Sequence, residues 1–138
     1  MGNALALTTG NDFEELAGLC HKVHHFLEGK QIPAAPVYKI DLALEEMLTN
    51  VIKYSYDDEN RHEIEVSLQL DNERILLEMR DDGHEFDPLA TPDANLSDEI
   101  SQRQVGGMGI HLTRSMVDAI SYSRKDNHNI VTISVNIN

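Results

Sequence analysis

The sequence predicts an α+β two-layer sandwich, in which about three helices cover one face of a mixed or antiparallel sheet. Apolar residues recur every three or four positions in two early stretches, as they do in amphipathic helices. In two later pairs of stretches they alternate with polar residues, as they do in β-hairpins. Grouped strands with helices between them are typical of this fold class.

Length and charge limit the kinds of partner that we expect. The 138 residues suit one domain, spanning 1–138, with a core of its own. The net charge of −13 repels phosphate backbones and anionic lipids, so we expect neither nucleic acid nor a membrane as a direct partner. The chain has one cysteine, no signal-peptide pattern and no apolar run of about 18 residues, which favours the cytoplasm.

The N-terminal part predicts a strand followed by a helix. Residues 4–8 alternate as a short strand, and Asp12 with Glu15 three residues later resembles a capping box. The helix runs to about Leu27 and ends at Gly29. Its predicted buried stripe consists of Phe13, Leu16, Cys20, Val23, His24 and Leu27. His21 and His25 are spaced to share a metal ion, but no acids complete such a site, and histidines near a helix C-terminus are favoured by the dipole anyway.

A second helix follows a connector at residues 32–36 and is best defined over 42–56. Its apolar stripe consists of Ile40, Leu44, Met47, Val51 and Tyr54. Glu46 and Asn50 are four residues apart at the edge of this stripe, one above the other. In that position they either line a cleft or simply solvate one shoulder of the helix.

The remaining chain predicts two hairpins separated by a long polar segment. Residues 62–70 and 75–81 alternate on either side of a turn at 71–73. Residues 84–105 are too polar and too long for an ordinary connection, so we expect a flexible lid, with a helical turn near 98–103. A third helix opens at Val105, and strands at 120–124 and 130–137 complete the chain.

Two glycine motifs carry possible chemistry. Gly106, Gly107, Met108 and Gly109 stand at a predicted helix start, where backbone N–H groups favour an anion. No Lys-Ser or Lys-Thr pair follows, so this is not a Walker loop, and glycine also serves helix starts for conformation alone. Asp81-x-Gly83 ends a strand, where a carboxylate accepts a hydrogen bond from an exocyclic amine, although Asp-Gly turns are common.

Taken together, these motifs resemble the three boxes of the GHKL ATPase superfamily. Glu46-x-x-x-Asn50, Asp81-x-Gly83 and Gly107-x-Gly109 stand in the order of that superfamily, and the polar segment before the third box resembles its ATP lid. The stretches EEMLTNVIKYSY, DDGHEFDP and VGGMGIHLTRSMVDAI look most like those of bacterial anti-sigma-factor serine/threonine kinases. The likeness covers roughly residues 8–137 and implies a Bergerat-type ATP-binding fold.

The resemblance implies a role for each matching residue. Glu46 would be the catalytic base that activates the attacking hydroxyl, and Asn50 would supply an oxygen to Mg²⁺. Asp81 would bind the adenine amine in a pocket shaped by Gly83. The stretch Gly106, Gly107, Met108 and Gly109 would hold the phosphates. Lys53, one turn after Asn50, either reaches a phosphate or is an ordinary surface lysine.

The implied function is an ATP- and Mg²⁺-dependent kinase that phosphorylates a serine on a STAS-class anti-sigma-factor antagonist in partner switching. A sigma factor or another output protein would be its second partner, and the family commonly forms homodimers. Val105 departs from the pattern, because many relatives carry a charged or polar residue there, and Arg103 is the nearest replacement. The alternative is therefore a non-catalytic module that binds a partner in response to nucleotide. A small α+β domain that binds no nucleotide is the remaining possibility.

Overall fold

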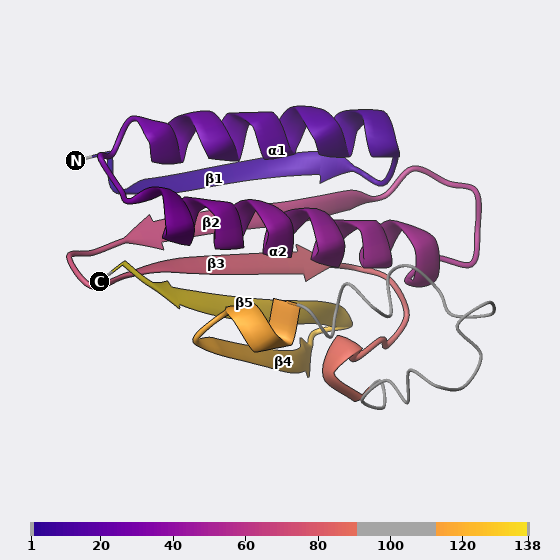
Figure 1. Ribbon diagram of the computed structural model, residues 1–138. Coiled ribbons are helices and arrows are strands. Elements are labelled where there is room, and N and C mark those ends of the chain that lie inside the picture. Colours follow the sequence, from indigo (N-terminus) through magenta and orange to yellow (C-terminus); the bar gives the residue numbers. More distant parts are fainter. Residues whose placement is uncertain (1, 91–112, 138) are drawn as a thin grey trace, which may run out of the picture.

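The computed structural model describes residues 2–90 and 113–137, which form an open sheet of five strands with helices on one face (Figure 1). The strands lie in the order β1-β2-β3-β5-β4, and every neighbouring pair is antiparallel. Their bounds are β1 Ala4–Gly10, β2 Glu63–Leu70, β3 Arg74–Asp81, β4 Ala119–Lys125 and β5 His128–Asn136. The predicted fold class is confirmed, and the sheet is antiparallel rather than mixed.

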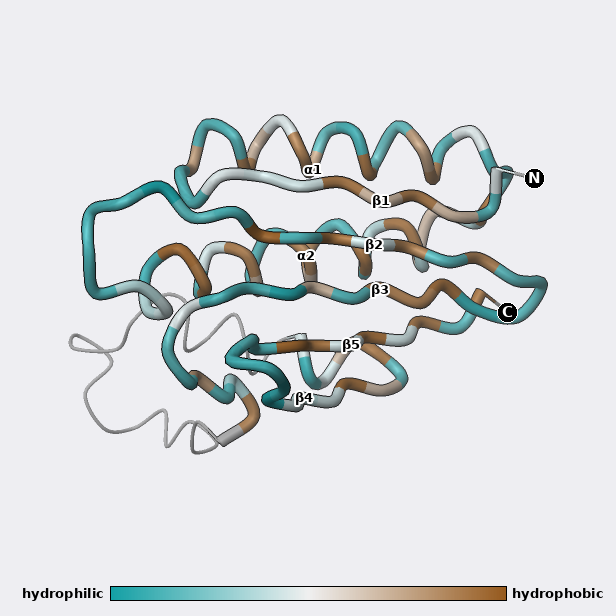
Figure 2. Tube along the Cα trace, turned by 180° about the vertical axis from the view of Figure 1, so that it is seen from behind, coloured by the Kyte–Doolittle hydropathy of each residue, from teal (hydrophilic) through white to brown (hydrophobic). Residues whose placement is uncertain are grey.

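Helices α1 (Phe13–Glu28) and α2 (Ala34–Tyr54) lie side by side over the sheet, and helical residues 113–116 lie on the same face (Figure 1). Seen from behind, the strands β1 to β5 face the viewer, and no described helix covers them (Figure 2). This one-sided cover explains the alternation along the strands. In β2, for example, Ile64, Val66 and Leu68 are buried against the helices, and their neighbours Glu65 and Ser67 are on the open face.

The core lies between the two long helices and the centre of the sheet. It contains apolar side chains from both layers, chiefly Val23, Leu27, Ile40, Leu44, Leu48, Ile64, Leu68, Ile75, Leu77, Ile133 and Val135, all fully buried. Burial of each such side chain stabilises a fold by roughly 1.5–3 kcal/mol before the entropy cost of ordering it. The predicted stripes of α2, β2 and β3 supply most of these residues.

Helix α1 begins with the predicted cap, in a modified form. The Asp12 Oδ1 atom accepts from the Glu15 backbone N–H at 2.8 Å, as expected. The Glu15 carboxylate does not return to Asp12, because its Oε1 accepts from the Gly10 N–H at 3.2 Å and both its oxygens bind Arg61. Glu15 thereby joins α1 to the segment before β2.

The predicted stripe of α1 is wrong at its start. Phe13 is 51% exposed, because as the first helical residue it has no preceding turn to pack against. Leu19, which the prediction omitted, is a core residue with 3% exposure. Cys20 and His24 are half-buried rather than buried, and His24 Nδ1 lies 2.6 Å from Asp41 Oδ2 on α2.

Helix α2 starts earlier than predicted. Residues 34–36, assigned to a connector, form its first turn, and the buried Pro36 is the third helical residue. Proline is tolerated there because the first N–H groups of a helix need no helical acceptor. The helix ends at Tyr54, which is half-buried and not part of the core.

The two hairpins are confirmed, with small changes at their ends: β4 begins at Ala119, and β5 begins at His128, two residues before the predicted start. The first strand, β1, extends to Gly10. Of the predicted lid, residues 84–90 are described, and they include the 3-10 helix η1 (Pro88–Ala90). The helical turn expected near 98–103 and the start of the third helix lie outside the described residues. Among the described helices, none combines the length and the apolarity that spanning a bilayer requires.

Candidate functional site

Glu46 and Asn50 lie one turn apart on α2, as predicted, at the border of the core. Asn50 is buried, with 1% exposure, and its Nδ2 donates to the Glu46 backbone oxygen at 2.7 Å. This bond holds the amide nitrogen toward the helix backbone and fixes the plane of the amide. Glu46 is half-buried, so the bland alternative of two solvating side chains does not describe Asn50.

The surroundings of Glu46 favour a proton acceptor. Burial raises the pKa of its carboxyl, the neighbouring Glu45 carboxylate raises it further, and the Lys53 ammonium lowers it. A raised carboxyl pKa brings the group closer to neutral pH, where a general base is most effective. Lys53 itself is exposed in the last turn of α2.

Asp81 ends β3 as a buried carboxylate with 4% exposure. Its Oδ1 atom accepts two hydrogen bonds, from the Gly83 N–H at 2.9 Å and from the Asn129 Nδ2 at 3.0 Å. Burial raises the pKa of Asp81, while these two donors lower it. A buried carboxylate held in this way is well suited to recognise a ligand that donates a hydrogen bond.

Asn50 and Asp81, which come from a helix and a strand, line one pocket. Its walls are Met47, Asn50, Val51, Met79, Asp81, Phe86, Pro88, Asn129 and Val131. These are apolar side chains with a few convergent polar groups, the composition typical of ligand pockets. The side chains fill most of the space, leaving about 10 Å³ for the centre of a water-sized molecule. A flat ring would therefore enter only if one wall moved.

The structure gives a reason for glycine at position 83 that the sequence did not reveal. A methyl group at this position would overlap the backbone carbonyl of Ser55, which follows α2. The neighbouring His84 N–H donates to the same Ser55 oxygen at 2.9 Å. Gly83 thus lets the turn after β3 pack directly against the end of α2, which brings Asp81 close to Asn50.

The third predicted motif is not part of the described structure. Gly106, Gly107, Met108 and Gly109 lie outside the described residues, as do Val105 and Arg103. The described chain resumes at the buried Thr113, in helical residues 113–116. The roles assigned to these glycines remain predictions.

Sequence reasoning missed the residues that the C-terminal hairpin brings to the pocket. Asn129, on β5, donates a hydrogen bond to Asp81. Two residues of β4, Tyr122 and Arg124, donate hydrogen bonds to Asn129. Phe86 forms part of the pocket wall and packs against Tyr54, with ring centroids 6.0 Å apart. The only signal in the sequence was a polar residue at the start of a strand, which is too common to indicate a site.

Described residues 2–90 and 113–137 contain no group of three or more histidine, cysteine or acidic side chains arranged to hold a metal ion. His21 and His25, four residues apart on α1, are both exposed.

Burial raises the pKa of the Cys20 thiol to about 11, so this half-buried group stays protonated near neutral pH.

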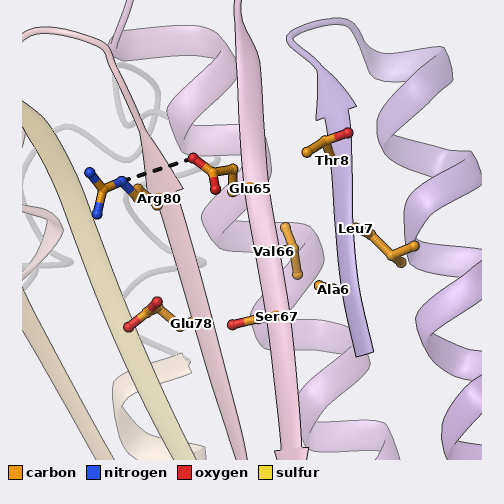
Figure 3. A pocket seen from close by; sticks show the side chains of 8 residues that line it. All are labelled: Ala6, Leu7, Thr8, Glu65, Val66, Ser67, Glu78 and Arg80. Atoms are coloured by element: carbon orange, nitrogen blue, oxygen red, sulfur yellow. Dashed lines mark ion pairs between the residues drawn. The ribbon is translucent and has the colours of Figure 1, made fainter. Parts of the chain in front are cut away.

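A wider hollow lies elsewhere, on the open face of the sheet (Figure 3). It is lined by Ala6, Leu7, Thr8, Glu65, Val66, Ser67, Glu78 and Arg80. Its one ion pair joins Arg80 Nε to Glu65 Oε2 at 3.9 Å, a long distance between partly exposed groups. The hollow contains none of the predicted site residues, so the candidate site is the narrow pocket at Asp81.

The chain resembles known proteins over most of its length. Residues 10–135 match the family described as "Histidine kinase-like ATPase domain". The chain is 26% identical over 97 residues to the serine/threonine-protein kinase BtrW of Bordetella bronchiseptica, covering 70% of this chain and 68% of that protein. It is 28% identical over 90 residues to the serine-protein kinase RsbW of Bacillus velezensis, covering 59% of this chain and only 53% of that protein.

Solved structures share the fold at low sequence identity. The structure of the RsbU and RsbW domains of a Mycobacterium tuberculosis protein is 11% identical to this chain, with a TM-score of 0.65. The match covers 96% of this chain and 32% of that one. A chain of the SiaB–SiaC complex of Pseudomonas aeruginosa is 14% identical, with a TM-score of 0.59, and covers 96% of this chain and 89% of that one.

Proposed function

The chain belongs to the histidine kinase-like ATPase family, and from that membership we propose that it binds ATP with Mg²⁺ and phosphorylates a serine or threonine of a protein partner. The observation that carries the proposal is the pocket in which Asp81 of β3 and Asn50 of α2 meet. The Asp81 carboxylate is suited to the adenine amine, and the Asn50 amide is suited to a hard cation near the phosphates. The kinase names of two relatives support the second half of the proposal.

In this proposal the base enters the pocket beside Asp81. Its amine donates to the carboxylate, while Met79, Val131 and Phe86 pack against the ring. Because the pocket is nearly filled by its own side chains, binding requires the wall at Phe86 and Pro88 to move outward. Gly106, Gly107, Met108 and Gly109 would hold the phosphates through their backbone N–H groups.

Asn50 fits a magnesium ion that arrives with the nucleotide. Its Nδ2 donates to the Glu46 backbone oxygen, which orients the amide, and an amide oxygen is a ligand type that Mg²⁺ accepts. A single protein oxygen suffices when phosphates and water complete the shell, and no denser ligand group occurs in residues 2–90 and 113–137. When bound, Mg²⁺ would neutralise charge on the phosphates.

Glu46 would accept the proton of the attacking hydroxyl, which its raised pKa favours. By resemblance, that hydroxyl belongs to a STAS-class antagonist, and a sigma factor or another output protein is the second partner of a homodimeric kinase.

We also propose that residues 1–138 form one domain, whose lid spans about 84–105. Lys53, exposed one turn beyond Asn50, would reach a phosphate.

Calorimetric titration with ATP, with and without Mg²⁺, tests the binding site. Asp81→Asn should weaken binding roughly ten- to a hundredfold, because a hydrogen bond to a charged group is lost. The same change at the exposed Asp126, in the turn between β4 and β5, is the matched control and should leave affinity unchanged. No binding by folded wild type would refute the proposal.

Phosphoryl transfer separates a kinase from a non-catalytic module, the alternative that Val105 favours. Glu46→Gln should keep its ATP affinity and lose transfer to the antagonist by about 100- to 10,000-fold, the usual contribution of a general base. Transfer is measured as phosphate incorporated into the antagonist in a single turnover. ATP binding without any transfer by the wild type would instead identify a nucleotide-dependent binding module.

A further inference from the structure

Asn129, the second residue of β5, has hydrogen bonds on both atoms of its amide and is 2% exposed. Its Nδ2 donates to Asp81 Oδ1 at 3.0 Å and to the His84 backbone oxygen at 2.8 Å. One bond reaches the end of β3 and the other the turn that follows it. A single amide therefore fixes the carboxylate and the backbone beside it.

The other side of the amide is held just as firmly. Asn129 Oδ1 accepts from the Tyr122 hydroxyl at 2.6 Å, from Arg124 Nη1 at 3.1 Å and from the Phe86 backbone N–H at 3.2 Å. Arg124 Nη1 also donates to the Gly83 backbone oxygen at 2.7 Å. With three donors at Oδ1, the amide cannot flip without placing its NH₂ group against them.

These bonds leave one oxygen of Asp81 for a ligand. Both protein donors, the Asn129 amide and the Gly83 N–H, bind Oδ1. Within the part of the chain that the structure describes, no donor is bonded to Oδ2. Asp81 lines the pocket, so a base that enters it meets the carboxylate oxygen to which no described donor is bonded.

We propose that Asn129 is a positioning residue for nucleotide recognition, which holds Asp81 in the orientation and the ionised state that select the amino group of adenine. This inference rests on the proposed function, because it concerns the same pocket. The carboxylate only accepts, so it favours a purine with an amine at position 6 over one with an oxygen there. Asn129 contributes to that choice without touching the base.

The charge of Asp81 depends on this support. Burial is the largest influence on its carboxyl and raises its pKa, whereas the N–H donors of Asn129 and Gly83 lower it. Without the Asn129 amide, the balance shifts toward the protonated acid. A protonated carboxyl presents an O–H donor, which suits a 6-oxo purine better than an amine.

The other charged groups near Asp81 act in opposite directions. Asp82, next in the chain, raises the pKa of Asp81, and Arg124 of β4 lowers it. Burial and, after it, the Asp81 charge raise the pKa of Tyr56, just after α2, so Tyr56 stays a neutral phenol. Among the described residues, Asn129 and Gly83 are the two hydrogen-bond donors that oppose the effect of burial on the pKa of Asp81.

The test is a calorimetric titration of the wild type and of Asn129→Leu with Mg·ATP and with Mg·ITP, which carries oxygen in place of the amine. Titrations run at several pH values between about pH 5.5 and about pH 8, because a raised carboxyl pKa moves titration toward neutral pH. Asn136→Leu, the same change at the exposed far end of β5, is the matched control.

In Asn129→Leu, we expect ATP to bind roughly ten- to a hundredfold more weakly near neutral pH. The preference for ATP over ITP should narrow, and the pH at which ATP affinity falls on acidification should move upward. A purely structural weakening would reduce both affinities together and leave that pH in place. Tyr122→Phe removes one donor to the amide and should shift the same quantities less.

The outcomes separate this inference from the proposed function. If the wild type prefers ATP and folded Asn129→Leu keeps its affinity, preference and pH profile, the inference is overturned and the ATP site stands. If Asn129→Leu does not fold, an unchanged pH profile in Tyr122→Phe overturns the inference. If the wild type binds neither nucleotide, the proposed function fails and the inference fails with it.

Discussion

At the scale of single residues, Gly83 makes the closest approach in the candidate site. Its N–H donates to Asp81, its oxygen accepts from Arg124, and its α-carbon lies against the Ser55 carbonyl. A side chain there has no room, because the obstacle is backbone rather than the end of a flexible side chain. The glycine is required for packing as much as for access to a ligand.

Gly83→Ala should therefore destabilise the protein by about 1–3 kcal/mol, the usual cost of forcing extra atoms into a packed site. Gly18→Ala is the matched control, because an added methyl on that exposed α1 residue meets nothing within 4 Å. The control should stabilise by about 0.5–1 kcal/mol, since alanine is the better helix former. Urea unfolding measures both, and equal effects of the two substitutions would contradict this account of Gly83.

At the scale of elements, His62 contacts both the segment after α2 and the turn after β3. His62 Nε2 lies 2.8 Å from Asp58 Oδ1, and its Nδ1 lies 3.3 Å from Asp82 Oδ1. Its ring stacks on Tyr56 with centroids 4.2 Å apart. These contacts join the segment that follows α2, the helix of Asn50, to the turn that follows β3, the strand of Asp81.

This contact makes stability depend on pH. The hydrogen bond that the His62 ring donates to the Asp58 carboxylate, supported by Asp82, raises the pKa of His62 above its ordinary value of 6.5. The charged imidazole is therefore favoured in the folded state, and its contribution is complete below about pH 6.5. That contribution is lost as the pH rises through the higher folded-state pKa.

We expect His62→Gln to be less stable than the wild type at about pH 6, with a difference that shrinks as the pH rises through the folded-state pKa of His62. Thermal unfolding at several pH values measures the difference. His24 also has a raised pKa, caused chiefly by Asp41, so only the wild-type-minus-variant difference isolates His62. The exposed His21→Gln is the control, and a His62→Gln deficit that does not change with pH would refute the ionic account.

At the scale of the whole molecule, the net charge of −13 opposes compactness. Self-repulsion among surface carboxylates is screened by salt, with a Debye length of about 8–10 Å near physiological ionic strength. Ion pairs such as Arg61 with Glu15 are screened as well, but these exposed pairs contribute little. We therefore expect the repulsion to be the larger of the two effects.

Raising NaCl from about 0.01 M to about 0.15 M should therefore increase the Tm, because the longer screening length at low salt leaves the repulsion unopposed. Differential scanning calorimetry in a low-salt buffer measures the change. A Tm that falls with added NaCl would mean that the ion pairs outweigh the repulsion.

Local patterns were enough to predict most elements and half of the site. The Asp12 cap, the β2–β3 hairpin and the spacing of Glu46 and Asn50 follow from neighbours a few residues apart. Such features depend on helical and strand periods and on turn chemistry, which are properties of short segments. The Asp81-x-Gly83 motif was recognised for the same reason.

Contacts between distant segments decided the rest. Asn129 lies 48 residues from Asp81, and their pairing follows from β5 returning between β3 and β4. Likewise, Phe13 and Leu19 could not be ranked by helical period, because exposure depends on where the helix extends beyond its neighbours. Strand order and register arise when whole faces are buried together, so no short pattern reveals which residue will meet Asp81.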